Sequence, residues 1–189
     1  MNGRDLFEKF SRQIELLAAA EKLLPKGFRE KRLAKLRNRD GKIAMVRRYL
    51  LVKSLAKKVG NNVAIFPGVF LENIENLSIG DNVSIHQMCY LDADGGIEIG
   101  NNVSIAHRTT ILSSNHTFSD LSVPIKYQDM ALERTVLHDD IWVGCGCAIL
   151  AGAEIESGCV IGANSTVLGK IGAMSVAVGS PARVIKTRS

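Results

Sequence analysis

Aliphatic side chains recur every six residues along the chain from residue 59 onward. The segments VGNNVAI (59–65), IGDNVSI (79–85) and IGNNVSI (99–105) repeat at a spacing of 20 residues, and the shorter period lies inside each of them. Every leading position of the six is Val, Ile or Leu: Val59, Ile65, Leu71, Ile79, Ile85, Leu91, Ile99, Ile105, Ile111, Leu137, Val143, Ile149, Ile155, Ile161 and Val167. A second set, four residues after a leader, is often small: Val63, Val83, Val103, Thr109, Cys147, Ala153, Cys159 and Ser165. This period matches neither a helix nor a simple strand.

A chain that turns a corner every six residues explains the period. Three such corners close a triangular coil, and two further residues per coil give the observed spacing of 20. The leaders then point inward and stack on the leaders of the next coil, while parallel ladders of backbone hydrogen bonds join the coils. The sequence therefore predicts a mainly β fold, a parallel β-helix. The spacing leaves its handedness open, because parallel crossover connections are normally right-handed.

The repeat is interrupted once. After Ile111 the sequence reads LSSNHTFSDLSVPIKYQDMALERT, and clear hexapeptides resume at Leu137. Residues 117–134 are therefore expected to leave the coil as a loop that begins beside His116. A loop of this length in a compact domain is usually functional or disordered.

The first 58 residues follow a helical pattern instead. Residues 4–24 carry apolar side chains at helical spacing, and Pro25 and Gly27 are expected to end this helix. Residues 28–39 are basic and predicted to be helical, and residues 43–58 form a second amphipathic stretch with a cationic face. The apolar positions of the two amphipathic stretches are Leu6, Phe10, Ile14, Leu17, Ile43, Val46, Leu50 and Leu55. The chain thus divides into a basic helical segment, 1–58, and a β-helix domain, 59–189.

Charge separates the same two parts. Residues 1–58 hold 17 Lys and Arg against 6 Asp and Glu, a net charge of +11, whereas residues 59–189 hold 7 against 13, a net charge of −6. The basic segment can cap the open end of the β-helix, which repeat folds and exposed strand edges require. It can also make peripheral contact with an anionic membrane, or meet an anionic glycan. Capping with solvated charge is the default interpretation, and nucleic acid is not expected because no binding motif accompanies the charge.

Composition and cysteine usage narrow the class of protein. With 46% hydrophobic and 23% charged residues, the 189-residue chain has the composition of a globular domain. The N-terminus lacks the apolar core of a signal peptide, and charges interrupt the apolar stretch near 43–56, so neither secretion nor a membrane span is expected. The four cysteines lack CxxC spacing and disulfide-scaffold density, which favours a reducing, cytoplasmic location.

The cysteines have a structural interpretation. Cys89, Cys147 and Cys159 fall on inward positions of the coil, where a small hydrophobic side chain fits. A metal site made of Cys145, Cys147 and His138 is the weaker alternative, and no metal is expected.

Three stretches resemble the hexapeptide-repeat acyltransferases, the left-handed β-helix family that includes maltose, galactoside and xenobiotic acetyltransferases. These stretches are the tandem hexapeptides, SSNHTFSD (113–120), and IWVGCGCAILAGAEIESGCVIGANSTV (141–167) leading into VAVGSPARVIK (176–186). The resemblance covers residues 59–186 and is closest to the polysaccharide O-acetyltransferases. It implies a left-handed coil, acetyl-CoA as donor, and a homotrimer with sites between subunits.

The chain departs from the family pattern in three places. Leu168 stands where relatives often have Thr, and His138 stands where Gly is common. The N-terminal segment also lacks the Lys-x-x-x-Gly-x-x-Tyr start of the maltose acetyltransferases. Maltose itself is therefore not the expected acceptor, and residues 1–58 lie outside the resemblance.

His116 is the candidate general base. Transfer of an acyl group from a thioester to a hydroxyl needs a base that takes the hydroxyl proton, and a neutral imidazole suits this step. Positions 20 apart stack one coil over, so Asp94 is expected below Ser114 on the same edge as His116. The resemblance places acceptor contacts at Asp94 and His86. A solvated Asp-Gly turn remains the alternative at Asp94.

The resemblance also implies a groove for the cofactor. Cys145 and Ala163 match positions at which backbone amides contact acetyl-CoA, and a backbone N–H there can stabilise an oxyanion. Arg183 and Lys186 match the cationic positions that meet the nucleotide phosphates. Trp142, the only tryptophan, is expected to face outward as a wall for pantetheine or acceptor, with interface packing as the alternative.

The sequence thus predicts a CoA-dependent O-acetyltransferase that acts on a hydroxyl of a sugar or glycan. An amine acceptor and a longer acyl group stay open. Two other functions compete: a metalloenzyme resembling γ-class carbonic anhydrases, and a non-catalytic β-helix used for assembly. The first of these needs three converging histidines, two of them close in sequence, and the four present are spread out: His86, His107, His116 and His138.

Overall fold

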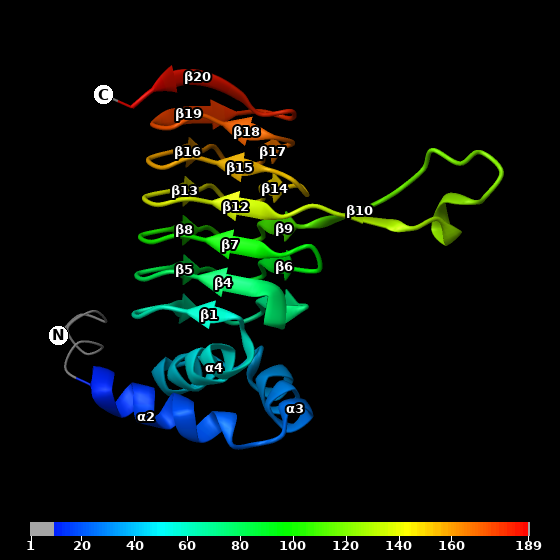
Figure 1. Cartoon of the computed structure of the whole chain (residues 1–189). Coiled ribbons are helices and arrows are strands. Elements are labelled where there is room, and N and C mark those ends of the chain that lie inside the picture. Colours follow the sequence, from blue (N-terminus) through cyan, green and yellow to red (C-terminus); the bar gives the residue numbers. More distant parts are fainter. Residues whose placement is uncertain (1–9, 189) are drawn as a thin grey trace.

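The structure, a computed structural model, describes residues 10–188 and consists of a triangular parallel β-helix with helices at one end and a protruding arm (Figure 1). Face A is built from β1 (Lys58–Val59), β4 (Leu77–Ile79), β7 (Ile97–Ile99), β12 (Thr135–Leu137), β15 (Glu154–Ile155) and β18 (Lys170–Ile171). Face B is built from β2 (Ala64–Ile65), β5 (Ser84–Ile85), β8 (Ser104–Ile105), β13 (Trp142–Val143), β16 (Val160–Ile161), β19 (Ser175–Val178) and β20 (Arg183–Thr187). Face C is built from β3 (Phe70–Glu72), β6 (Tyr90–Asp92), β9 (Thr110–Leu112), β14 (Ala148–Ile149) and β17 (Thr166–Val167).

The core follows the six-residue pattern. Every leading position from Val59 to Val167 is buried except Leu71, which is partly exposed, and every member of the second set is buried. Leaders stack as predicted: Ile79 pairs with Ile99, 20 residues later, and Leu137 pairs with Ile155, 18 residues later. Each fully buried Ile or Leu contributes about 1.5–3 kcal/mol to stability, so this aliphatic column holds the coils together. The predicted mainly β, parallel fold is confirmed.

The corners between faces A and B explain the repeated Asn-rich motif. In each coil one residue there adopts a left-handed backbone, with φ between 53° and 58° at Asn62, Asn82, Asn102 and Asp140. Asn and Asp tolerate this conformation better than other residues with a side chain. Their amides also form a ladder between coils, with Asn62 Nδ2 donating to Asn82 Oδ1 at 2.9 Å.

The repeat opens once, at the corner between faces C and A, into the arm drawn in Figure 1. Strand β10 (Ser114–His116) leaves the coil and pairs antiparallel with β11 (Met130–Leu132), with His116 opposite Met130. A 3-10 turn, η2 (Ile125–Tyr127), lies near the tip, and another, η1 (Ile74–Asn76), lies at the same edge near the N-terminal end. The arm carries exposed apolar side chains, including Phe118, Leu121 and Tyr127.

Three helices cover the N-terminal end of the coil: α2 (Ser11–Lys22), α3 (Lys26–Leu36) and α4 (Lys42–Leu55). The predicted helix over 4–24 begins outside the described residues, and Gly27 lies inside α3 rather than ending the preceding helix. The predicted apolar face of α4 is buried at Leu50 and Leu55 but was wrong at Ile43 and Val46, which are exposed. Arg48 is buried instead.

The burial of Arg48 has a physical cause. Strand β2 is the lowest strand of face B, so the carbonyl oxygen of Ile65 has no further coil to bind. Arg48 Nε donates to that oxygen at 2.9 Å, and Nη1 donates to the carbonyl oxygens of Leu36 and Arg39 after the end of α3. Tyr49 Oη donates to the carbonyl oxygen of Gly60 at 2.8 Å. Within residues 10–188, no helix is long and apolar enough to cross a bilayer.

Candidate active site

His116 lies at the root of the arm, where the chain leaves face C. Its side chain is exposed, and its strand β10 is held against β11 by antiparallel pairing. The next residue, Thr117, donates both its N–H and its hydroxyl to the carbonyl oxygen of Asp129, at 2.9 and 2.8 Å. These bonds fix the backbone beside His116, so the imidazole projects from an ordered base rather than from the tip of a loop.

Asp94 lies on the same edge, one coil below. Face C pairs Asp92 with Leu112, which sets Asp94 at the level of Ser114, as the repeat arithmetic predicts. The corner is tightly packed, because a Cβ on Gly95 would lie 2.2 Å from the carbonyl oxygen of Ser113. The Asp94 carboxylate is exposed and makes no hydrogen bond or ion pair with any other residue of 10–188. The carboxylate is therefore free to bind a ligand, and a contact between Asp94 and the acceptor substrate remains a prediction.

His86 lies at a different edge, between faces B and C, which we call the B–C edge (66–69, 86–89, 106–109, 144–147 and 162–165). Its ring stacks on Phe66, with ring centroids 4.6 Å apart and planes inclined by 8°. The strands of face C separate this edge from the edge that carries His116 and Asp94. A single chain therefore does not bring His86 together with the candidate base.

The five residues expected at the cofactor do gather in one region. Trp142 points outward from face B and is 57% exposed. Pairing runs from Trp142 through Val160 and Val176 to Lys186, which places Lys186 about 14 Å along the same column. Arg183 lies on the same strand, β20, opposite Val178. Cys145 and Ala163 lie on the adjoining B–C edge, on neighbouring coils, where the N–H of Asn164 donates to the carbonyl oxygen of Cys145.

The backbone of the B–C edge offers a row of unpaired donors. The N–H groups of Cys145 and Ala163 donate to no other group in the described chain, and the same holds one and two coils below, at His107 and Gln87. The corresponding N–H groups between faces A and B are satisfied, since Asn61, Asp81 and Asn101 each donate to a side chain of the next coil. Unpaired N–H groups aligned along one edge are suited to bind an extended ligand that is rich in acceptor atoms.

A pattern in the sequence marks this row of unpaired N–H groups, and the prediction from single residues missed it. Between faces A and B, the second position of successive corners is Asn or Asp, whose short side chain can accept from the coil below: Asn61, Asp81, Asn101 and Asp139. On the B–C edge the same position holds residues whose side chains accept no such bond within the described chain: Gln87, His107, Cys145 and Ala163. Gln87 and His107 were not among the predicted site residues.

The competing metal sites are not assembled. His86, His116 and His138 lie on three different edges of the prism. The side chain of Cys147 points into the core, whereas Cys145 is only half-buried and His138 is exposed on another edge. In the part of the chain that the structure describes, no three His, Cys, Asp or Glu side chains are grouped so that they could hold a metal ion.

Comparisons with known proteins find similarity to acetyltransferases. Residues 134–169 match the model of the bacterial transferase hexapeptide family, which describes six repeats. A protein of Mycobacterium tuberculosis assigned as an acetyltransferase is 37% identical over 78 residues, which are 41% of this chain and 26% of that protein. An Escherichia coli protein assigned as an O-acetyltransferase of lipopolysaccharide biosynthesis is 32% identical over 89 residues, covering 43% and 45% of the two chains. The chain thus spans less than half the length of these relatives.

Two solved structures match over most of the chain. A maltose O-acetyltransferase from Clostridium difficile 630 shares 29% identity over 84% of both chains, with a TM-score of 0.76. A galactoside acetyltransferase in complex with coenzyme A shares 28% identity over 87% of this chain and 81% of that one, with a TM-score of 0.75. The fold is therefore that of the hexapeptide-repeat, left-handed β-helix acetyltransferases, and the predicted handedness is confirmed with it.

Proposed function

We propose that this chain transfers an acetyl group from acetyl-CoA to a hydroxyl of a sugar or glycan, with His116 as the general base. The observation that carries the proposal is the row of unpaired backbone N–H groups beside the exposed Trp142. The amide and phosphate oxygens of a CoA chain are acceptors that suit such a row. The matched galactoside acetyltransferase, whose structure contains coenzyme A, supports this assignment of the donor.

The cofactor would follow the row and the adjoining part of face B. Arg183 and Lys186 are exposed at the C-terminal end of face B and supply positive charge for phosphate groups. Trp142 supplies a flat apolar wall next to the unpaired N–H groups. Gly144 is required there, because a Cβ at this position would lie 2.5 Å from the backbone nitrogen of Ala163.

The chemistry needs one proton acceptor and one stabiliser of negative charge. The acceptor hydroxyl oxygen attacks the thioester carbonyl carbon while the His116 imidazole takes the hydroxyl proton. The tetrahedral intermediate carries its negative charge on the former carbonyl oxygen, where a backbone N–H of the row can stabilise it. Collapse breaks the carbon–sulfur bond, and the imidazolium returns the proton to the departing CoA thiolate.

The proposal requires more than one copy of the chain. His116 and Asp94 lie on one side of face C, whereas His86, Trp142 and the row of N–H groups lie beyond its other side. A cyclic homotrimer brings the His116 edge of one subunit against the B–C edge of its neighbour. The arm would then cover the neighbour with its exposed apolar side chains, such as Phe118 and Leu121.

Mixed assemblies test this arrangement directly. His116→Ala removes the base, and Ala163→Trp fills the groove, so each variant alone should be inactive. Co-expressed at equal levels, the two variants form random trimers in which about a quarter of the seams pair an intact His116 with an intact groove. Recovery of about that share of wild-type turnover supports shared sites, and no recovery contradicts them.

The acceptor is proposed from the sugar-acting proteins among the matches. A screen that follows free thiol release from acetyl-CoA over sugars, nucleotide sugars and oligosaccharides tests both the reaction and the acceptor class. Thiol release that depends on an added sugar supports the proposal. A chain that fails to bind acetyl-CoA in equilibrium dialysis would contradict it. All four cysteines are free thiols in the structure, in keeping with a proposed reducing, cytoplasmic setting.

A further inference from the structure

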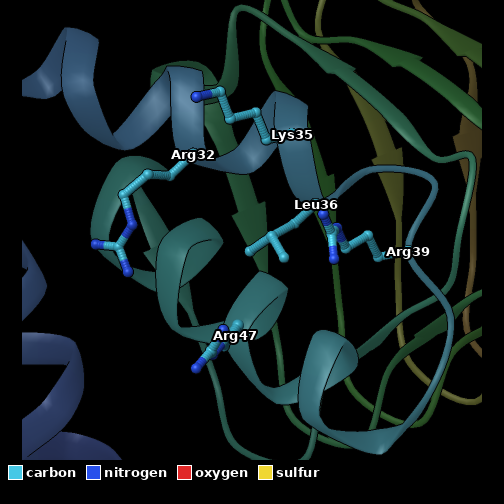
Figure 2. Close-up of a pocket in the computed structure, with 5 residues that line it drawn as sticks. All are labelled: Arg32, Lys35, Leu36, Arg39 and Arg47. Carbon is cyan, nitrogen blue, oxygen red and sulfur yellow. The ribbon is translucent and has the colours of Figure 1, made fainter.

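Helices α2, α3 and α4 (residues 11–55) form what we call the helical end of the molecule. It carries a pocket that the proposed reaction does not use. An open pocket of about 320 Å³ lies between α3 and α4 and is lined by Arg32, Lys35, Leu36, Arg39 and Arg47 (Figure 2). Four of these five residues are cations, and Leu36 provides an apolar wall. The pocket lies at the N-terminal end of the coil, whereas His116 and the cofactor residues lie farther along it.

The positive charge of this pocket is largely unpaired. Arg32 pairs with Glu21, but the side chains of Lys35, Arg39 and Arg47 form no ion pair or hydrogen bond with any other residue of the described chain. Like charges that line one pocket without counter-charges repel one another. An anion that enters the pocket would relieve this repulsion, so the site is suited to a phosphate group.

Exposed apolar side chains lie on the same helix faces as the cations. Phe28 precedes Arg32 by one turn of α3, and the guanidinium lies 5.8 Å from the centre of the Phe28 ring. Ile43, which is 73% exposed, precedes Arg47 by one turn of α4, and Val46 is exposed next to it. A free phosphate ion would explain the cations but not these apolar neighbours, whereas a phospholipid surface contacts both.

The charge distribution of the whole chain determines which end of the molecule would face an anionic surface. Residues 1–58 carry a net charge of +11 and residues 59–189 a net charge of −6. An anionic surface therefore attracts the helical end and repels the β-helix. A trimer of the kind proposed above, with its axis along the stacked coils, would turn three such ends toward the same surface and strengthen binding.

From these observations we propose that the helical end docks on an anionic phospholipid bilayer, with a lipid phosphate in the pocket between α3 and α4. The contact lies at the membrane surface, where Phe28, Ile43 and Val46 meet the boundary of the acyl chains. This inference does not depend on acetyl transfer, because neither its residues nor its test involves the groove or His116.

Vesicle co-sedimentation of the full chain tests the proposal. Wild-type protein should sediment with vesicles of phosphatidylcholine and phosphatidylglycerol, remain in solution with phosphatidylcholine alone, and be released by salt. Lys35→Glu and Arg47→Glu should each weaken the partition by about fivefold for every unit of positive charge lost. Lys126→Glu is the matched control, because Lys126 is exposed on the arm and the charge change is the same.

Three further outcomes separate a bilayer from other occupants. Ile43→Ser should weaken vesicle binding while leaving any affinity for inorganic phosphate, measured by calorimetry, unchanged. Binding of inorganic phosphate without vesicle sedimentation would overturn the proposal in favour of a free-anion site. A loss with Lys126→Glu as large as that with Arg47→Glu would also overturn it, since the binding would then be non-specific attraction. Circular dichroism spectra and thermal unfolding without vesicles should match the wild type in all four variants, which shows that they fold.

Discussion

The guanidinium of Arg48 donates from Nε to the backbone carbonyl oxygen of Ile65 at 2.9 Å, although the residue is only 2% exposed. This bond joins the helical end to the first coil, because Ile65 lies in the lowest strand of face B. The same side chain holds the carbonyl oxygens of Leu36 and Arg39 through Nη1. Arg48 therefore links α3, α4 and the β-helix through three backbone acceptors.

We predict that Arg48→Met lowers the free energy of unfolding by roughly 3 kcal/mol. Each buried acceptor that loses its donor costs about 1–3 kcal/mol, and water can reach part of this site to replace the lost bonds. Arg48→Lys should recover only part of the loss, because one ammonium group cannot reproduce the spread of the guanidinium. Urea unfolding measures the change. Arg47→Met, at the exposed neighbouring position, should stay within about 0.5 kcal/mol; equal losses at both positions would contradict the structural role.

A second prediction concerns pH. Glu154 Oε1 lies 3.1 Å from His138 Nε2, and Lys170 Nζ lies 3.5 Å from Glu154 Oε2. The hydrogen bond with His138, together with the positive charge of Lys170, holds the pKa of Glu154 below its ordinary value of 4.5. A carboxyl group with a lowered pKa in the folded state adds stability above its unfolded pKa, and this stability disappears as the pH falls through the lowered value.

Glu154→Gln should therefore lower the Tm at neutral pH slightly and make the Tm fall less on acidification below 4.5. Thermal unfolding followed by circular dichroism over this range measures the difference. Glu72→Gln is the control, because Glu72 is also exposed and forms no ion pair in the described chain. Identical pH profiles for the wild type and Glu154→Gln would show that the contact carries no stability.

The core could be predicted from the sequence because a six-residue corner allows few places for an aliphatic side chain. Ile105 and Ile149 illustrate this: each leads a hexapeptide, and each is fully buried. The orientation of α4 could not be predicted in this way. Its pattern suggested that Ile43 faces the core and Arg48 faces solvent, but the unpaired carbonyl of Ile65 in another element reverses the outcome. Tertiary hydrogen bonding decided the buried face there, and helical periodicity does not report it.

The candidate site, too, could be predicted only in part from the sequence. The position of His116 at the start of the arm followed from the interruption of the repeat. The row of donors was foreseen only at Cys145 and Ala163, through resemblance, because the groups that matter are backbone N–H groups and not side chains. The separation of His116 from this row follows from the order of the three faces, which a count of hexapeptides alone does not show.

The cysteines give a third prediction, which also reports on the groove. Burial raises the pKa of the Cys89 thiol to about 11 and raises the pKa of Cys147 and Cys159 as well. Only the thiolate reacts with an alkylating agent, so native protein at pH 8 should be labelled by iodoacetamide first at the half-buried Cys145. Acetyl-CoA should slow this labelling if it occupies the B–C edge. Peptide mass spectrometry identifies the labelled site, and labelling of Cys145 that saturating acetyl-CoA leaves unchanged would place the cofactor elsewhere.

The last prediction addresses the base. His116→Ala should lower kcat by about 10²–10⁴, the usual contribution of a positioned proton acceptor. The affinity for acetyl-CoA should stay near that of the wild type, because within one chain the row of unpaired N–H groups lies on a different edge from His116. Steady-state thiol release and equilibrium binding measure the two quantities separately. His138→Ala removes another exposed imidazole, on the third edge of the prism, and should retain turnover. If His116→Ala keeps turnover while His138→Ala loses it, the catalytic edge has been assigned to the wrong corner of the coil.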